Sequence, residues 1–201
     1  MTASITLYNL GDYNEGRLNP FTIDLTDCIT SYYYLKRVAQ GMWDTATSGN
    51  VLSSRCTACG HIHIANVMTK CKICGSTESE TKITGEEWII ADYEGIPAKY
   101  IGTYNLDGEY FYYKKMLEDS EMDSDAFDAG VACSIDLDKI ADAYQGNYSS
   151  DEDFAIECAA VMGFFDEVAV WPETCIDWKQ TAYELMFDYV AENGHYFSMY
   201  V

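Results

Sequence analysis

Residues 56–75 read CTACGHIHIANVMTKCKICG and contain two Cys-x-x-Cys-Gly motifs, Cys56–Gly60 and Cys71–Gly75. In each motif a tight turn directs two thiolates toward one ion, and the trailing glycine tolerates the backbone conformation that this turn needs. Four thiolates in a tetrahedral arrangement are typical of a structural Zn²⁺ site with no open coordination position. The predicted zinc ligands are Cys56, Cys59, Cys71 and Cys74.

The segment between and around these motifs, residues 50–84, is expected to form a zinc ribbon. His61 and His63 lie inside it and are interpreted as surface or packing residues, because four cysteines already complete the ligand set. Residues 45–77 contain three bases and no acid, so contact with nucleic acid is one interpretation of the ribbon. We favour the other, in which the metal stabilises an insert too small to fold alone.

The sequence on either side of the ribbon predicts a small α+β domain covering residues 1–97. Alternating apolar and polar residues indicate strands, and helical spacing of apolar residues indicates one helix. The expected elements are strands at residues 5–10, 21–25 and 86–92, a turn at 11–16, and a helix capped by Asp27 that ends near residue 40. The ribbon is then an insert in this N-terminal domain, at about residues 50–84.

Two further domains are predicted, a mostly helical acidic domain at residues 98–148 and an α+β domain at 149–201. The elements expected in the last domain are a helix with a capping box at Ser149 and Glu152 that is closed by Gly163, a helix from Asp177 to about residue 191, and a strand at 195–201. The predicted fold class is α+β, an elongated chain of small α+β and helical domains with a four-cysteine zinc-ribbon insert in the N-terminal domain.

The chain is strongly acidic, with 33 Asp and Glu against 12 Lys and Arg and a formal net charge of −21. The last 81 residues carry 18 acids and two bases. Disorder is excluded, because 48% of residues are hydrophobic and 14% are aromatic. Such a surface is repelled by DNA and by anionic lipid, so the expected partner is a basic surface.

The remaining features of the sequence concern location and chemistry. No apolar run is long enough to span a membrane, and no signal peptide is expected at the N-terminus. Cysteines in metal-type pairs suit a reducing cytoplasm, which is the expected location. There is no nucleophile elbow, phosphate-binding loop or dinucleotide fingerprint, and the three histidines are scattered. No catalytic residue is predicted.

Four blocks of sequence, in order, resemble the ArdA antirestriction family. They are YNLGDYNEG at 8–16, EWIIADYEGIP at 87–97, YQGNYSSDEDFA at 144–155, and the stretch from IDW at 176–178 to NGHYF at 193–197. The cysteine ribbon is not part of that family pattern, so its role is not implied by the resemblance. Tyr183 stands where the family pattern leads us to expect a basic residue.

The resemblance implies an elongated, acidic homodimer of three-domain subunits that imitates bent B-DNA. Such a protein is not an enzyme; it occupies the DNA-binding cleft of type I restriction–modification enzymes and is not expected to bind DNA itself. The candidate DNA-mimic residues are Asp119, Glu121, Asp123, Asp125, Asp128, Asp136, Asp138, Asp142, Asp151, Glu152, Asp153, Glu157, Asp166, Glu167, Asp177, Glu184 and Asp188.

Three alternatives stay open at the level of sequence. The first alternative is a zinc-ribbon regulator that binds nucleic acid. The second is a metal-dependent hydrolase with an acidic cleft, and the third is a halophilic protein whose acidity needs no partner. A regulator would shift DNA in a gel, and a hydrolase would lose activity with a chelator. The four blocks argue against halophilic adaptation as the whole explanation.

Overall fold

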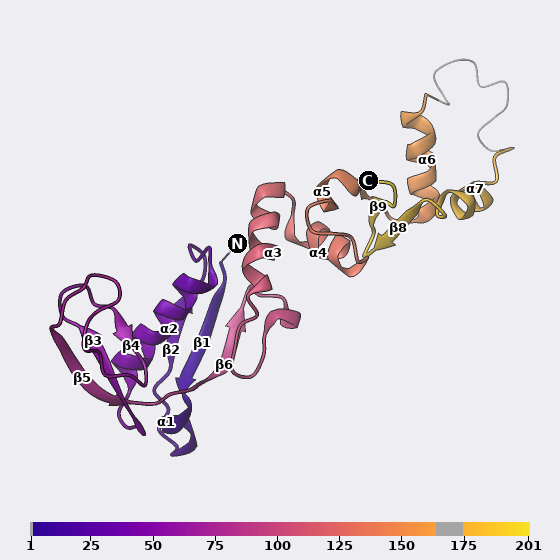
Figure 1. Ribbon diagram of the computed structural model, residues 1–201. Coiled ribbons are helices and arrows are strands. Elements are labelled where there is room, and N and C mark those ends of the chain that lie inside the picture. Colours follow the sequence, from indigo (N-terminus) through magenta and orange to yellow (C-terminus); the bar gives the residue numbers. More distant parts are fainter. Residues whose placement is uncertain (1, 164–174) are drawn as a thin grey trace. The chain divides into compact units, whose positions relative to one another are not determined.

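Figure 1 shows a computed structural model of the chain, which describes residues 2–163 and 175–201. Helices alternate with small three-stranded antiparallel sheets, which confirms the α+β class. The chain divides into two compact units, Met1–Lys114 (unit 1) and Lys115–Val201 (unit 2). The three-domain division expected from the sequence stays a prediction.

Unit 1 contains two sheets, with strand orders β2-β1-β6 and β4-β3-β5. The second sheet is formed by the cysteine segment. The elements that begin in unit 1 are β1 (Ser4–Asn9), α1 (Leu10–Asn14), β2 (Phe21–Asp24), α2 (Ser31–Thr45), β3 (Val51–Cys56), β4 (Ile62–His63), β5 (Ser79–Thr84), β6 (Trp88–Glu94), the 3₁₀ helix η1 (Ala98–Tyr100) and α3 (Glu109–Ser120).

The core of unit 1 lies between the first sheet and α2. Strand β1 alternates half-buried and buried residues, as a strand with one covered face should. Helix α2 approaches β2 closely at Gly41, where a Cβ atom would lie 2.1 Å from the ring of Phe21. A larger residue at position 41 would therefore push the helix away from the sheet. The buried apolar side chains at this contact are Ile5, Leu7, Ile23, Val38 and Met42.

The buried carboxylate of Asp12 ties α1 to the segment that leads from α2 into β3. It accepts hydrogen bonds from Ser48 Oγ at 2.6 Å, from the Thr47 backbone N–H at 3.2 Å and from Arg17 Nε at 3.1 Å. Desolvation opposes ionisation of Asp12, but these hydrogen bonds outweigh it and lower the pKa of the carboxyl. An ionised Asp12 therefore helps to fix the position at which the ribbon begins.

Other contacts fix the end of the ribbon, where β5 returns to the rest of unit 1. Strands β3 and β5 pair along their length, beginning with Val51 opposite Thr84. Gly49 lies so close to Thr84 that a Cβ atom would be 1.9 Å from its carbonyl oxygen. Lys82 of β5 donates a hydrogen bond at 2.7 Å to the carbonyl of Trp43 in α2. The ribbon therefore leaves and rejoins the rest of unit 1 at adjacent points.

Unit 2 combines short helices with a sheet of order β7-β9-β8. Its core contains Phe127, Phe154 and Phe197, none of which is more than 1% exposed. Phe154 stacks on Tyr196 with ring centroids 4.5 Å apart, so α6 is fixed on the sheet by aromatic contact. The elements are α4 (Ser124–Ala132), α5 (Ile140–Ala143), β7 (Tyr144–Asn147), α6 (Asp151–Val161), α7 (Trp178–Leu185), β8 (Tyr189–Glu192) and β9 (His195–Ser198).

The structure differs from the expectation at α1 and at the start of α2. Residues 10–14 form α1 rather than the end of a strand and part of a turn, because the side chain of Asn9 accepts hydrogen bonds from the first free N–H groups. Helix α2 is capped by Thr30 instead of Asp27, with Thr30 Oγ1 accepting from the N–H of Tyr33 at 3.4 Å. In both helices the cap is the residue whose oxygen reaches an unpaired N–H two or three positions later.

The start of α6 also moves by one residue. The cap is Ser150 instead of Ser149, and its hydroxyl accepts from the N–H of Asp153 at 3.1 Å. The backbone of Ser150 is extended, as an N-cap requires. The expected end of the helix was correct, since α6 stops at Val161 and Gly163 adopts a positive φ of 74°.

The expected helix from Asp177 to about residue 191 is shorter than predicted. Helix α7 does begin after Asp177, which caps it, but it ends at Leu185. Residues 189–192 form β8, which pairs with β9 through a tight turn. Asn193 and Gly194 both have positive φ, 52° and 81°. This is the geometry of a type I′ turn, whose twist matches that of the two strands it connects.

We expect Asp12→Asn to lower the free energy of unfolding by about 1–3 kcal/mol at neutral pH. The change keeps the shape of the side chain but turns one NH₂ toward N–H and O–H donors. A lower urea midpoint would measure the loss.

The effect should depend on pH. Because the pKa of Asp12 is lowered in the folded state, its stabilisation is present above the unfolded pKa and is lost as pH falls through the folded pKa. The gap between wild type and variant should therefore shrink below about pH 4. Asp27→Asn, at an exposed position, is the control. Equal losses in both variants would contradict the role given to Asp12.

Candidate functional site

The four cysteines predicted from the sequence come together in space. Their sulfur atoms all lie within 4.8 Å of one another, and all four thiols are free. Cys56 and Cys74 have their sulfurs 3.6 Å apart, and so do Cys59 and Cys71. A tetrahedron with metal–sulfur bonds of about 2.3 Å has edges of about 3.8 Å, so the spacing fits one ion. Disulfides would need about 2 Å.

Two equivalent turns build this cluster. The N–H of Gly60 donates to the carbonyl of Cys56 at 2.8 Å, and the N–H of Gly75 donates to the carbonyl of Cys71 at 2.9 Å. Both glycines adopt the left-handed conformation, with φ of 72° and 75°. The Cys-x-x-Cys-Gly pattern therefore encodes the turn as well as the ligands. Within each turn the first cysteine is buried and the second is exposed.

Backbone N–H groups around the cluster favour thiolates at two of the four positions. The N–H groups of Cys74 and Ile73 are the main reason that the pKa of Cys71 falls to about 7. Desolvation opposes ionisation of Cys56, but backbone N–H groups in its own turn outweigh it and lower its pKa. These donors would remain beside the sulfurs of a bound metal and stabilise their charge.

The thiols nevertheless cannot all ionise together without a cation. A backbone hydrogen bond from His61 favours the Cys59 thiolate, but desolvation and three neighbouring sulfurs outweigh it and raise the pKa of Cys59 to about 12. A divalent ion removes this conflict because it supplies the opposite charge at the centre of the cluster. The donor set and its electrostatics therefore both suit a metal centre.

The two ribbon histidines lie beside the cluster as packing residues rather than as ligands. Their rings contact each other edge to face with centroids 4.6 Å apart. Burial lowers the pKa of His63. Within residues 2–163 and 175–201, the groups of three or more potential metal-binding side chains comprise the four cysteines alone.

The candidate DNA-mimic residues of the sequence are almost all on the surface. Fourteen of the seventeen are exposed and Glu152 is half-buried, while Asp166 and Glu167 lie outside the described residues. The fourteen exposed acids are Asp119, Glu121, Asp123, Asp125, Asp128, Asp136, Asp138, Asp142, Asp151, Asp153, Glu157, Asp177, Glu184 and Asp188.

Charge is distributed very unevenly between the two units. By sequence, unit 2 contains 20 acids and three bases, a net of −17, and unit 1 has a net of −4. Even if each of its three lysines paired with a carboxylate, most of the acids of unit 2 would have no cation within that unit. Its surface therefore carries a strong negative potential.

Several of these acids also have structural roles, of which those of Asp177 and Glu152 at helix starts were expected from the sequence. Asp123 caps α4 and Asp177 caps α7, each accepting a backbone N–H. Asp151 accepts a hydrogen bond at 2.6 Å from the hydroxyl of Tyr196. Three acids occupy the first turn of α6, where the positive end of the helix dipole stabilises them.

In the described part of the chain, no helix combines the length and apolar character needed to cross a bilayer. Among known families, the model described as antirestriction protein (ArdA) matches residues 7–197. No curated protein and no solved structure gives a significant match.

The cysteine geometry predicts one divalent metal ion per chain. We expect native mass spectrometry of the purified protein to show this ion, and Cys71→Ser to lose it together with the fold of the ribbon. Cys133→Ser, which changes a half-buried thiol of unit 2, is the matched control and should keep the metal. Full metal content in Cys71→Ser would contradict the site.

Proposed function

The chain belongs to the ArdA antirestriction protein family, and from this we propose that it inhibits type I restriction–modification enzymes by mimicking the phosphate array of B-DNA. The single observation that best supports the proposal is the set of exposed carboxylates in unit 2. They outnumber the available bases so strongly that the unit must present unneutralised negative charge to its surroundings.

The amount of charge is on the scale of a DNA site. Duplex DNA carries one negative charge per about 1.7 Å, or two per base pair. Unit 2, with −17, thus matches the charge of roughly eight base pairs. We propose a homodimer as the active species, since two chains would carry about twice −21 and match roughly 21 base pairs.

The way the acids are held favours binding. They project from short helices and their caps, on a unit with an aromatic core. Docking therefore orders only side chains, whereas a disordered acidic tail would also have to order its backbone, at about 1–2 kcal/mol per residue. A fixed anionic surface also accelerates the encounter with a basic cleft.

Inhibition by this route breaks and forms no covalent bond. The inhibitor occupies the cleft that DNA would enter, and DNA and inhibitor exclude each other. The lysine and arginine side chains that neutralise phosphates would neutralise carboxylates in their place.

For the cysteine cluster we propose Zn²⁺ in a structural role. Zinc prefers four thiolates in tetrahedral array, and such a site has no position left for a substrate. Residues 51–84 have little apolar core of their own. Among the described residues, the buried apolar cluster of this segment consists of Cys56, Met68 and Cys71. The ion would stabilise the segment in place of a larger core. In this reading the ribbon is an insert in an otherwise ordinary family member.

Competition at varied salt tests the mimicry. The protein should displace a labelled duplex from a type I restriction–modification enzyme at near-stoichiometric amounts. Its affinity should fall by about a hundredfold or more between about 50 mM and about 300 mM salt, as for a ligand that replaces many phosphate contacts. A flat response to salt would be inconsistent with a phosphate-like surface.

A cluster reversal tests which surface binds. Asp136, Asp138 and Asp142 are exposed, and no side-chain hydrogen bond among the described interactions is built on them, so changing all three to Lys spares the helix caps. We expect inhibition to weaken about tenfold or more, since each exposed pair contributes about 0.2–1 kcal/mol and reversal also adds repulsion.

The control makes the same charge change in unit 1, with Glu86, Glu87 and Glu94 changed to Lys. These are also exposed, and their reversal should weaken inhibition less. If the unit 1 variant loses as much inhibition as the unit 2 variant, the assignment of the surface to unit 2 is wrong.

A further inference from the structure

One segment of this acidic chain has the opposite charge. Residues 28–77, which span α2 and most of the ribbon, contain five bases and a single acid, Asp44, a net of +4. The expectation that the protein does not bind DNA rests on the charge of the whole chain and does not describe this part of it. The five bases are Lys36, Arg37, Arg55, Lys70 and Lys72.

A pocket of about 400 Å³ opens on this segment, between α2 and the start of β4. Tyr32, Lys36 and Gln40 line it from α2, where a spacing of four residues places them on one face of the helix. Gly60 and His61 line it from the ribbon. The pocket lies entirely within unit 1.

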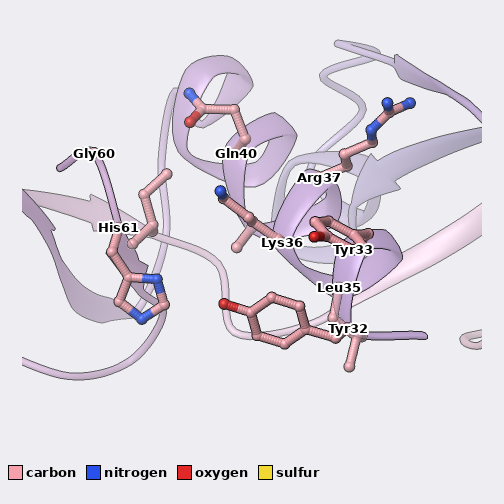
Figure 2. A pocket seen from close by; sticks show the side chains of 10 residues that line it. Tyr32, Tyr33, Leu35, Lys36, Arg37, Gln40, Gly60 and His61 are labelled. Atoms are coloured by element: carbon pink, nitrogen blue, oxygen red, sulfur yellow. The ribbon is translucent and has the colours of Figure 1, made fainter. Parts of the chain in front are cut away.

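Figure 2 shows how the side chains are arranged. Tyr32 directs its hydroxyl end toward the ring of His61 across the pocket, and the amino group of Lys36 lies above the gap between them in this view. Arg37 points away and donates a hydrogen bond to the carbonyl of Asp24. Lys36 forms no ion pair within residues 2–163 and 175–201.

The Tyr32 side of the pocket is exposed in a way that core packing does not explain. Of the consecutive tyrosines at positions 32–34, only Tyr34 is buried, at 2% exposure. Tyr32 is 57% exposed, and Leu35 beside it is 50% exposed. Core packing therefore accounts for only one of these three tyrosines.

We propose that this pocket binds single-stranded nucleic acid, with an unpaired base stacked on the ring of Tyr32 beside His61 and a phosphate at Lys36. Aromatic faces combined with unpaired cations are the chemistry that recognises exposed bases and their backbone. A duplex keeps its base faces stacked and offers only phosphates. An acidic peptide would pair with the lysines but would leave both ring faces without a planar partner.

The ribbon carries further cations outside the pocket. Lys70 and Lys72 are exposed beside the second cysteine turn, and Lys72 contributes to the positive potential at His63. A strand held at Lys36 therefore has further cations within the same unit along which to extend. The ribbon then forms one wall of a binding site, in addition to containing the cysteine cluster that stabilises its fold.

The test uses the full-length purified protein and a fluorescein-labelled oligodeoxythymidylate of about 15 nucleotides, with binding followed by anisotropy at low salt. We expect saturable binding that weakens as salt is raised. Tyr32→Ala should weaken it about tenfold, whereas Tyr32→Phe, which keeps the ring, should bind like wild type. Lys36→Glu should weaken it at least as much as Tyr32→Ala.

Matched controls change the same residue types elsewhere on the surface. Tyr104→Ala removes another exposed ring of unit 1, and Lys179→Glu reverses an exposed lysine on α7. Both should bind the oligonucleotide like wild type. No saturable binding at low salt, equal binding by wild type and Tyr32→Ala, or equal competition by a duplex or by polyglutamate would each overturn the assignment.

Oligonucleotide binding at this pocket does not depend on DNA mimicry by unit 2, and the two can fail separately. Lys36→Glu should leave inhibition of the restriction–modification enzyme intact. The unit 2 cluster reversal should leave oligonucleotide binding intact or strengthen it, because it removes negative charge.

Discussion

Mutual repulsion between carboxylates is the constraint on which the structure of unit 2 depends. Unit 2 holds 20 acids and three bases, so its compact state has to be stabilised by something other than ion pairs. Buried aromatic rings supply much of that stabilisation, with Phe127, Phe154 and Phe197 at its centre. Helix N-termini add local stabilisation, since acids at Asp123, Asp177 and the first turn of α6 meet unpaired N–H groups.

Unit 1 is built under a different constraint, because its second sheet has too little apolar surface to hold itself. The ribbon is fixed at one end by the sulfur cluster and at the other by hydrogen bonds at its base, through Asp12 and Lys82. Basic side chains outnumber acidic ones on α2 and most of the ribbon, since residues 28–77 contain five bases and one acid. The basic surface is confined to residues 28–77, with a net charge of +4, whereas unit 1 as a whole has −4 and unit 2 has −17.

The features that could be predicted from the sequence are those encoded over short distances. The four-cysteine cluster follows from two five-residue motifs whose turns are closed by Gly60 and Gly75, and strand β1 of the first sheet follows from alternation. The end of α7 was missed because apolar residues continue at helical spacing into β8, although the turn at Asn193 and Gly194 marks the hairpin. The pocket was missed because it joins Lys36 to His61, which only tertiary packing brings together. Composition shows that acids must be exposed, but it does not show which ones share a face.

The pairing of Val51 with Thr84, with Gly49 packed against the same residue, has a consequence for how the chain can change in length. The first and last residues of the ribbon are therefore adjacent, so the segment between them leaves the rest of unit 1 and returns at one place. A shortened chain would need only a tight link across those neighbouring ends to join α2 to β6. We therefore expect that the ribbon can be shortened or lengthened while the β2-β1-β6 sheet keeps its register.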